Sequence, residues 1–93
     1  MFSEEAVRNL SRMPPAERAL LKEGIRKHMV EADPGQTTRN KFRLRRVSPF
    51  AEFELRIRSW RVFYRIRDSV VEVIMIGEKR GNRLLIGGEE FDL

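Results

Sequence analysis

Arginines on two neighbouring predicted strands are the residues of this chain best suited to do chemistry. In the segment 53–67, FELRIRSWRVFYRIR, apolar and polar side chains alternate with a period of two, which predicts a β-hairpin. A two-residue turn in it places Arg56 directly opposite Arg61, and Glu54 opposite Phe63. Like charges that face each other across strands destabilise a sheet, whereas a phosphate bound between them would turn repulsion into a clamp. We therefore predict an anion site at Arg56 and Arg61.

The neighbours of these two arginines allow two interpretations. Arg65 continues the same face of the hairpin, and an exposed Phe63 among cations would stack a nucleobase. Alternatively, Glu52 and Glu54 neutralise the arginines, and Phe63 packs beneath a loop. We favour the anion site, because charge concentrated in this way is typical of functional sites.

The charge of the chain is concentrated around the hairpin. The 93 residues carry a net charge of +5, made up of zero over 1–34, +8 over 35–83 and −3 over 84–93. A basic block of this kind favours a polyanionic partner, nucleic acid first and an acidic protein second. Three cations that alternate along the segment 41–47 would follow a phosphate backbone, or would form a solvated strand edge: Lys41, Arg43 and Arg45.

Two amphipathic helices are predicted before the sheet. Ser3 can cap a first helix that carries Glu4 and Glu5 in its first turn, where the helix dipole favours acidic residues. Pro14-Pro15 ends this helix and begins a second, predicted over 15–32. The apolar faces of both helices need a surface to pack on.

The rest of the chain predicts a meander of strands. Apolar or alternating segments are found at 41–47, 53–57, 60–66 and 70–76, the last of them apolar enough to be buried on both faces. A basic loop is expected over 77–82 and a further short strand at 83–86. The segment 83–93 ends in acidic residues, which would either form an unstructured tail or fold over the basic face and mask it. We predict one α+β domain over 1–93, with an N-terminal helical hairpin packed on a mainly antiparallel sheet of four or five strands.

Composition excludes several classes of site. The chain has no cysteine, hence no disulfide and no thiolate metal ligand, which fits a reducing cytoplasm. Its single histidine, His28, excludes catalysis by two histidines and a histidine metal cluster. Because side chains alternate between the two faces of a strand, the single tyrosine, Tyr64, is expected on the core side of the hairpin. No apolar run approaches the roughly 20 residues of a membrane span. We expect a cytoplasmic protein without metal, cofactor or membrane partner.

Three motifs occur in an order that is typical of one family. They are Phe2-Ser3 with Ala6, Leu10 and a proline-containing turn; Glu54-Leu55-Arg56-Ile57 with a two-residue turn and Trp60-Arg61-Val62-Phe63-Tyr64; and Ile76-Gly77 with Lys79-Arg80. Together they resemble the RelE/ParE superfamily of bacterial toxins over residues 2–80. The resemblance implies a small α+β toxin neutralised by a cognate antitoxin. Many members cleave mRNA on the ribosome, and others inhibit DNA gyrase.

The resemblance also implies catalytic roles. Ribosome-dependent members activate a ribose 2′-OH to attack the adjacent phosphate, which needs a base, charge stabilisation and an acid. Arginine stays protonated, so Arg56 and Arg61 would hold and stabilise the phosphate. The base candidates are Lys79, with Arg80 as its companion, and Glu54, since cations nearby favour a neutral lysine. Otherwise Lys79 and Arg80 are ordinary loop charges, and Glu54 only pairs with an arginine.

The sequence departs from the family pattern in three places. Members usually have a β-strand before the Phe2-Ser3 segment, so we expect this first strand to be missing. The turn Arg58-Ser59 replaces a frequent Gly-Asp, and arginine disfavours positive φ, so a looser turn is expected. Leu84-Leu85-Ile86 stands where ribonucleolytic relatives often carry Tyr or His. Three hypotheses remain: an mRNA endonuclease that inhibits translation and arrests growth, a non-enzymatic gyrase inhibitor, and an inactive module that only binds an antitoxin.

Overall fold

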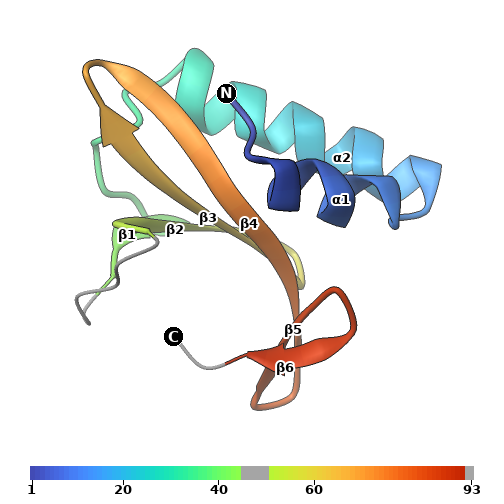
Figure 1. Ribbon diagram of the computed structural model, residues 1–93. Helices are drawn as coiled ribbons and strands as arrows, with labels where there is room; N and C mark the ends of the chain where they lie inside the picture. The colour runs from blue at the N-terminus through green and yellow to red at the C-terminus, as the bar shows by residue number, and fades with distance from the viewer. Residues whose placement is uncertain (45–50, 92–93) are drawn as a thin grey trace.

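Two helices cover one face of a strongly curved, six-stranded sheet (Figure 1). The computed structural model describes residues 1–44 and 51–91. The elements are α1 (Glu4–Ser11), α2 (Pro15–Ile25), a π-helical turn (Arg26–Val30), β1 (Lys41–Arg43), β2 (Phe53–Ile57), β3 (Trp60–Arg67), β4 (Val70–Arg80), β5 (Arg83–Ile86) and β6 (Glu89–Phe91). Each strand pairs antiparallel with the next along the chain. The predicted α+β fold is confirmed, with one strand more than expected.

The helices begin where the sequence predicts. The Ser3 side chain accepts a hydrogen bond from the Ala6 N–H at 3.0 Å and caps α1, and Pro15 occupies the first turn of α2. The second helix differs from the prediction at its end, because α-helical geometry stops at Ile25 and a single π-helical turn follows. None of the helices formed by the described residues is long and apolar enough to cross a membrane.

The helices and the sheet enclose the main hydrophobic core. It includes Ala6, Leu10, Leu21, Ile25, Leu55, Val62, Val73 and Ile76. Tyr64 is fully buried in it, stacks on Phe53 with ring centroids 5.1 Å apart, and donates a hydrogen bond to the Pro34 carbonyl at 2.7 Å. Burial raises the pKa of the Tyr64 hydroxyl, and the Asp33 charge adds to the effect. The core position predicted for Tyr64 is confirmed.

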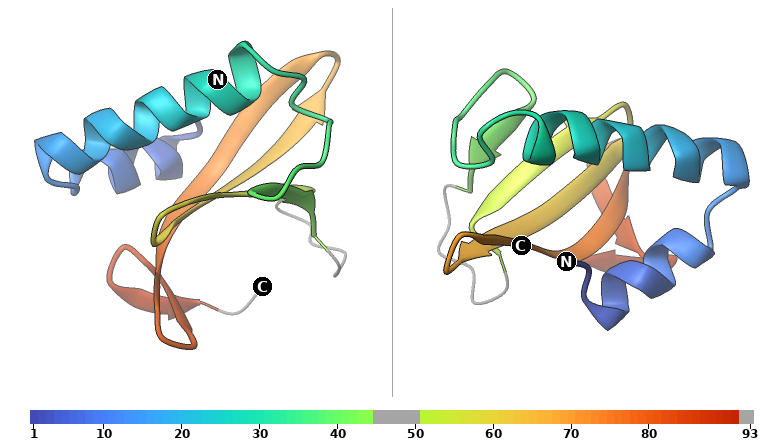
Figure 2. Two further views of the ribbon diagram at one scale, coloured as in Figure 1. Left: turned by 180° about the vertical axis from the view of Figure 1, so that it is seen from behind. Right: turned by 90° about the horizontal axis from the view of Figure 1, so that it is seen from above.

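A second, smaller core lies on the other face of the sheet. Figure 2 shows the sheet curling so that β1 and the β5–β6 hairpin flank this face, which we call the open face because no helix covers it. Phe63 is 1% exposed there and packs with Ala51, Met75 and Ile86. β4 is therefore buried on both sides, as predicted. The expectation of an exposed Phe63 that stacks a base is wrong.

The C-terminal third forms more regular structure than expected. β4 continues through Lys79 and Arg80, where a basic loop was predicted, and β5 pairs with it. Residues Glu89–Phe91, in the segment where an unstructured tail or a mask was expected, form strand β6, and the last two residues lie outside the described part of the chain. Gly87 and Gly88 adopt φ angles of 63° and 84°, which allow the tight reversal between β5 and β6.

The first residues of the chain lie beside β4. The Val73 N–H donates to the Met1 carbonyl at 2.8 Å, and the Ser3 N–H donates to the Val73 carbonyl at 2.9 Å. Phe2 thereby forms a parallel bridge with Val73. Part of the β4 edge is paired by these residues before α1 begins.

Gly77 allows β5 to lie close against β4. A Cβ atom at this position would lie 2.9 Å from the Leu85 carbonyl oxygen and 2.8 Å from Cγ1 of Ile86. Because a backbone carbonyl cannot rotate aside, we expect Gly77→Ala to separate the strands and lower the free energy of unfolding by about 1–3 kcal/mol in guanidinium denaturation. Gly81→Ala is the control, since it meets no atom within 4 Å and costs about 1 kcal/mol from its φ of 61° alone. A smaller loss at Gly77 than at Gly81 would contradict the close approach.

Candidate functional site

The β2–β3 hairpin has the predicted register. The partners are Phe53 with Tyr64, Glu54 with Phe63, Leu55 with Val62, Arg56 with Arg61, and Ile57 with Trp60. The turn keeps two residues although Arg58 has a φ of 55°, so the expected looser turn is wrong. The Arg61 guanidinium donates to the Arg58 carbonyl at 2.8 Å and so helps to hold this conformation.

Glu54 lies between the two arginines of the predicted anion site. Nε of Arg56 donates to Oε2 of Glu54 at 2.8 Å, and Nε of Arg61 lies 3.9 Å from the same oxygen. The side chains of Glu54 and Arg61 are each 13% exposed, whereas that of Arg56 is 48% exposed. The opposed charges are thus bridged by a carboxylate of the chain itself, and the three side chains keep one net positive charge.

Arg61 is a partly desolvated cation in a fixed position. Its Nη1 donates to the carbonyls of Arg58 and Trp60 at 2.8 and 3.0 Å. Burial lowers the pKa of Arg61, the Arg56 charge lowers it further, and Glu54 opposes both. A guanidinium remains protonated at neutral pH nonetheless. A phosphate oxygen reaching Arg61 would therefore meet a full charge in a poorly hydrated site, where it interacts more strongly than in water.

Phe42 of β1 is a member of this cluster that the sequence reasoning missed. The Arg56 guanidinium lies 4.7 Å from the centroid of the Phe42 ring, and Phe42 faces Glu54 across the strand pair. The ring therefore holds Arg56 beside Glu54 through a cation–π contact. The alternation along 41–47 contained the signal, because it puts Phe42 on the face opposite to Lys41.

Lys79 and Arg80 do not act as companions in this structure. They are successive residues of β4, so their side chains point to opposite faces. Lys79 faces Leu84 across the strand pair, and its N–H donates to the Ser59 carbonyl at the hairpin turn at 2.7 Å. Lys79 thus belongs to the open face, beside the turn that carries Arg61. Arg80 points to the helix-covered face and pairs with Glu78 at 2.9 Å.

The cations of β1 do not lie on the open face. Lys41 pairs with Leu55 and Arg43 with Phe53, so both belong to the helix-covered face. Lys41 is fully buried, and its Nζ donates to the carbonyls of His28 and Asp33 at 2.6 Å each. Its predicted contact with RNA is wrong. The Arg43 guanidinium lies 4.8 Å from the Phe53 ring on that same face, and Arg45 lies outside the described residues.

The remaining candidates lie at the margin of the site or away from it. Arg65 pairs with Glu72, its partner across the strands, at 2.9 Å, and is largely neutralised by it. His28 lies in the π-helical turn, where burial lowers its pKa and the charges of Lys41 and Lys27 lower it further. Within 1–44 and 51–91, no three His, Cys, Asp or Glu side chains come together as metal ligands would.

Comparisons with known proteins agree with this geometry. No family model and no curated protein matches the chain. It is similar to a chain in the crystal structure of the toxin–antitoxin complex RelBE2 from Mycobacterium tuberculosis, with 26% sequence identity and a TM-score of 0.66. The match covers 85% of this chain and 94% of that one. Together with two helices on an antiparallel sheet and the register of the β2–β3 hairpin, this similarity shows a RelE-like fold and supports a RelE-type toxin.

Proposed function

We propose that this protein is the toxin of a bacterial toxin–antitoxin module and cleaves mRNA on the ribosome, in the cytoplasm. The similarity to a chain of a toxin–antitoxin complex supports the toxin role and an antitoxin partner. The observation that carries the proposed cleavage is the cluster of Arg56, Glu54 and Arg61 on the open face. It combines two phosphate-binding groups with a carboxylate that is already within hydrogen-bonding distance of one of them.

Substrate binding would release the carboxylate of this cluster. Arg56 is half exposed and can turn toward a phosphate, while Arg61 is held by the hairpin turn. A phosphate that accepts hydrogen bonds from both guanidinium groups replaces Glu54 as their anionic partner. Glu54 then stands beside the bound phosphate with a free oxygen, in a position to accept a proton from the neighbouring ribose.

The reaction follows from these positions. Glu54 accepts the proton of the 2′-OH, O2′ forms a bond to phosphorus, and the P–O5′ bond breaks. We assign the proton that the departing O5′ takes up to the Lys79 ammonium, because Lys79 belongs to the open face and its backbone is bonded to the hairpin turn that precedes Arg61. Arg61 and Arg56 stabilise the charge that develops on the phosphate oxygens. The products are a 2′,3′-cyclic phosphate and a 5′-hydroxyl end.

A second candidate function is binding without cleavage, for example inhibition of DNA gyrase. One observation favours it: the single histidine and the single tyrosine of the chain both lie away from the open face, His28 in the π-helical turn and Tyr64 in the core. The open face thus has no imidazole or phenol to move a proton. Loss of supercoiling by gyrase in the presence of the purified protein would support this candidate.

Primer extension after induction in a bacterial host tests the first proposal. We expect new 5′ ends within translated messages and none within a message whose start codon has been removed, because the proposed cleavage needs the ribosome. Growth arrest with intact messages would contradict an endonuclease and would leave the gyrase assay to decide on the second candidate.

A further inference from the structure

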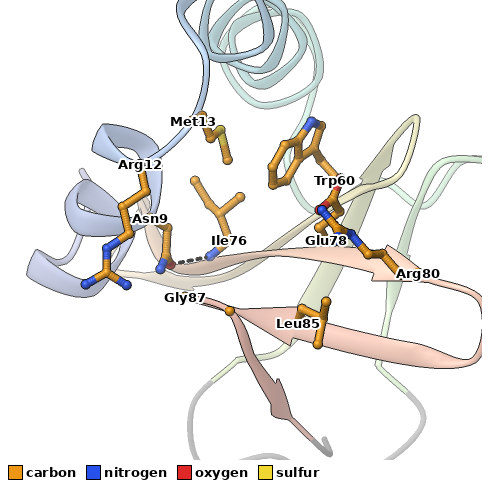
Figure 3. A pocket seen from close by; sticks show the side chains of 10 residues that line it. Asn9, Arg12, Met13, Trp60, Ile76, Glu78, Arg80, Leu85 and Gly87 are labelled. Atoms are coloured by element: carbon orange, nitrogen blue, oxygen red, sulfur yellow. Dashed lines mark hydrogen bonds and ion pairs between the residues drawn. The ribbon is translucent and has the colours of Figure 1, made fainter.

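A second site lies on the opposite side of the sheet from the open face. Figure 3 shows this pocket between the end of α1, the hairpin residue Trp60 and the β4–β5 hairpin. We call it the Trp60 pocket. Its volume is about 280 Å³, enough for one or two large apolar side chains. The argument uses six of its lining residues, Arg12, Met13, Trp60, Ile76, Glu78 and Leu85.

The floor of the Trp60 pocket is apolar. Met13, Ile76 and Leu85 line it from three different elements, and the Trp60 indole stands beside them (Figure 3). The indole is held in place, because its Nε1 donates to Oε2 of Glu17 at 2.8 Å. An apolar side chain that enters would therefore find a preformed surface to bury against.

The rim carries a cation, Arg12, whose charge reaches Glu5 but which makes no close ion pair with a described residue. Arg12 makes no ion pair with any residue that the structure describes, whereas Arg80 pairs with Glu78. Nη1 of Arg12 lies 2.9 Å from the position that a Cβ atom would take at Gly87, so the guanidinium packs closely over this glycine. The glycine turn thus places an unpaired charge beside an apolar floor.

We propose that the Trp60 pocket binds an apolar side chain of an acidic segment of the antitoxin, with a carboxylate of that segment paired to Arg12. The partner's class rests on the proposed function. Charge complementarity supports an acidic segment, because Arg12 is the unpaired cation at the rim. The exposed, side-chain-free Gly87-Gly88 turn also lets a peptide backbone come close. RNA fits less well, because the floor formed by Met13, Ile76 and Leu85 is apolar and offers a phosphate no partner, and because Arg80 of the lining is already paired with Glu78.

Trp60 makes this proposal directly measurable, because it is the only tryptophan of the chain. We would titrate the full chain with a hexapeptide of alternating glutamate and leucine and follow Trp60 emission. A saturable blue shift is expected, with no shift for the matching lysine–leucine peptide. Arg12→Glu should weaken binding about fivefold or more, since it replaces an attraction by a repulsion. The control Arg8→Glu makes the same charge reversal one turn earlier on α1, outside the pocket, and should change affinity less than about twofold.

Three results would overturn the proposal: no shift with the acidic peptide, equal weakening by Arg12→Glu and Arg8→Glu, or an Arg12-dependent shift with hexauridylate, which would make the pocket a nucleic-acid site. The outcome is independent of the cleavage proposal. Arg12 lies on the other side of the sheet from Arg61, so Arg12→Glu should still cleave mRNA. Conversely, a wild-type protein that cleaves nothing could still bind the peptide.

Discussion

Replacing Arg61 by alanine is expected to abolish growth arrest and to lower the rate of mRNA cleavage by about 10²–10³-fold, the usual effect of removing one donor that stabilises a developing oxyanion. Arg61 is the one cation of the cluster that is both largely buried and held by two carbonyls. Arg56 cannot replace it, because its half-exposed side chain depends on Phe42 and Glu54 for its position.

The control must separate catalysis from folding. Arg61→Ala also removes two hydrogen bonds at the hairpin turn, so its thermal midpoint should be compared with that of wild type. Arg67→Ala removes the same charge from the exposed far end of β3 and should remain toxic. Arg61→Lys keeps the charge but loses the planar, forked set of N–H donors, so its toxicity should lie between that of Arg61→Ala and that of Arg67→Ala. A folded Arg61→Ala variant with full toxicity would contradict the proposed role.

Lys41→Met is expected to have a large effect on stability. It keeps the length of the buried side chain but removes both hydrogen bonds from Nζ, leaving the carbonyls of His28 and Asp33 without this partner. Burying an unsatisfied carbonyl costs about 1–3 kcal/mol, so we expect a loss of about 2 kcal/mol, or about 10 °C in the thermal midpoint. Circular dichroism during heating measures this loss.

Lys27→Met is the matched control for Lys41→Met. Lys27 lies in the π-helical turn with an exposed side chain, and the same substitution there should shift the midpoint by no more than a few degrees. Equal midpoints for the two variants would mean that Lys41 does not tie the end of the helical hairpin to β1.

The register of the hairpin at the centre of the site could be predicted from the sequence. A period of two fixes which side chains share a face, and the two-residue turn fixes the register, so the opposition of Arg56 and Arg61 follows from local information alone. Ser3 and Pro15 mark the helix starts for the same reason, since capping depends on residues only three positions apart.

The burial of Lys41 and Phe63 depended on contacts distant in sequence. Lys41 looks like any other cation in a basic strand, and its burial arises only when β1 pairs with β2 next to the carbonyls after α2. Phe63 is covered because the sheet curls until Ile86 of β5 reaches it, with a bulge at Phe63 and Tyr64. The alternation of residues within the hairpin cannot predict this curvature of the sheet.

The predicted strand at 83–86 is confirmed as β5, but strand β6, which pairs with it, was missed although the sequence contains a signal for it. Gly87-Gly88 between the apolar segment 83–86 and the segment 89–91 is a hairpin signal. The acidic composition of the end of the chain favoured a tail instead. The approach of Gly87 to Arg12 at the end of α1 is a contact between distant parts of the chain, so the Trp60 pocket could not be predicted from this hairpin signal alone.

Cleavage of a 5′-labelled mRNA on purified, programmed ribosomes tests the central claim most directly. The account predicts that wild-type protein produces discrete fragments ending in a 2′,3′-cyclic phosphate, that Arg61→Ala produces none at the same concentration, and that free mRNA stays intact. Intact mRNA on ribosomes treated with a wild-type protein that still arrests growth would contradict it. Equal cleavage by wild type and a folded Arg61→Ala variant would contradict the assignment of the site.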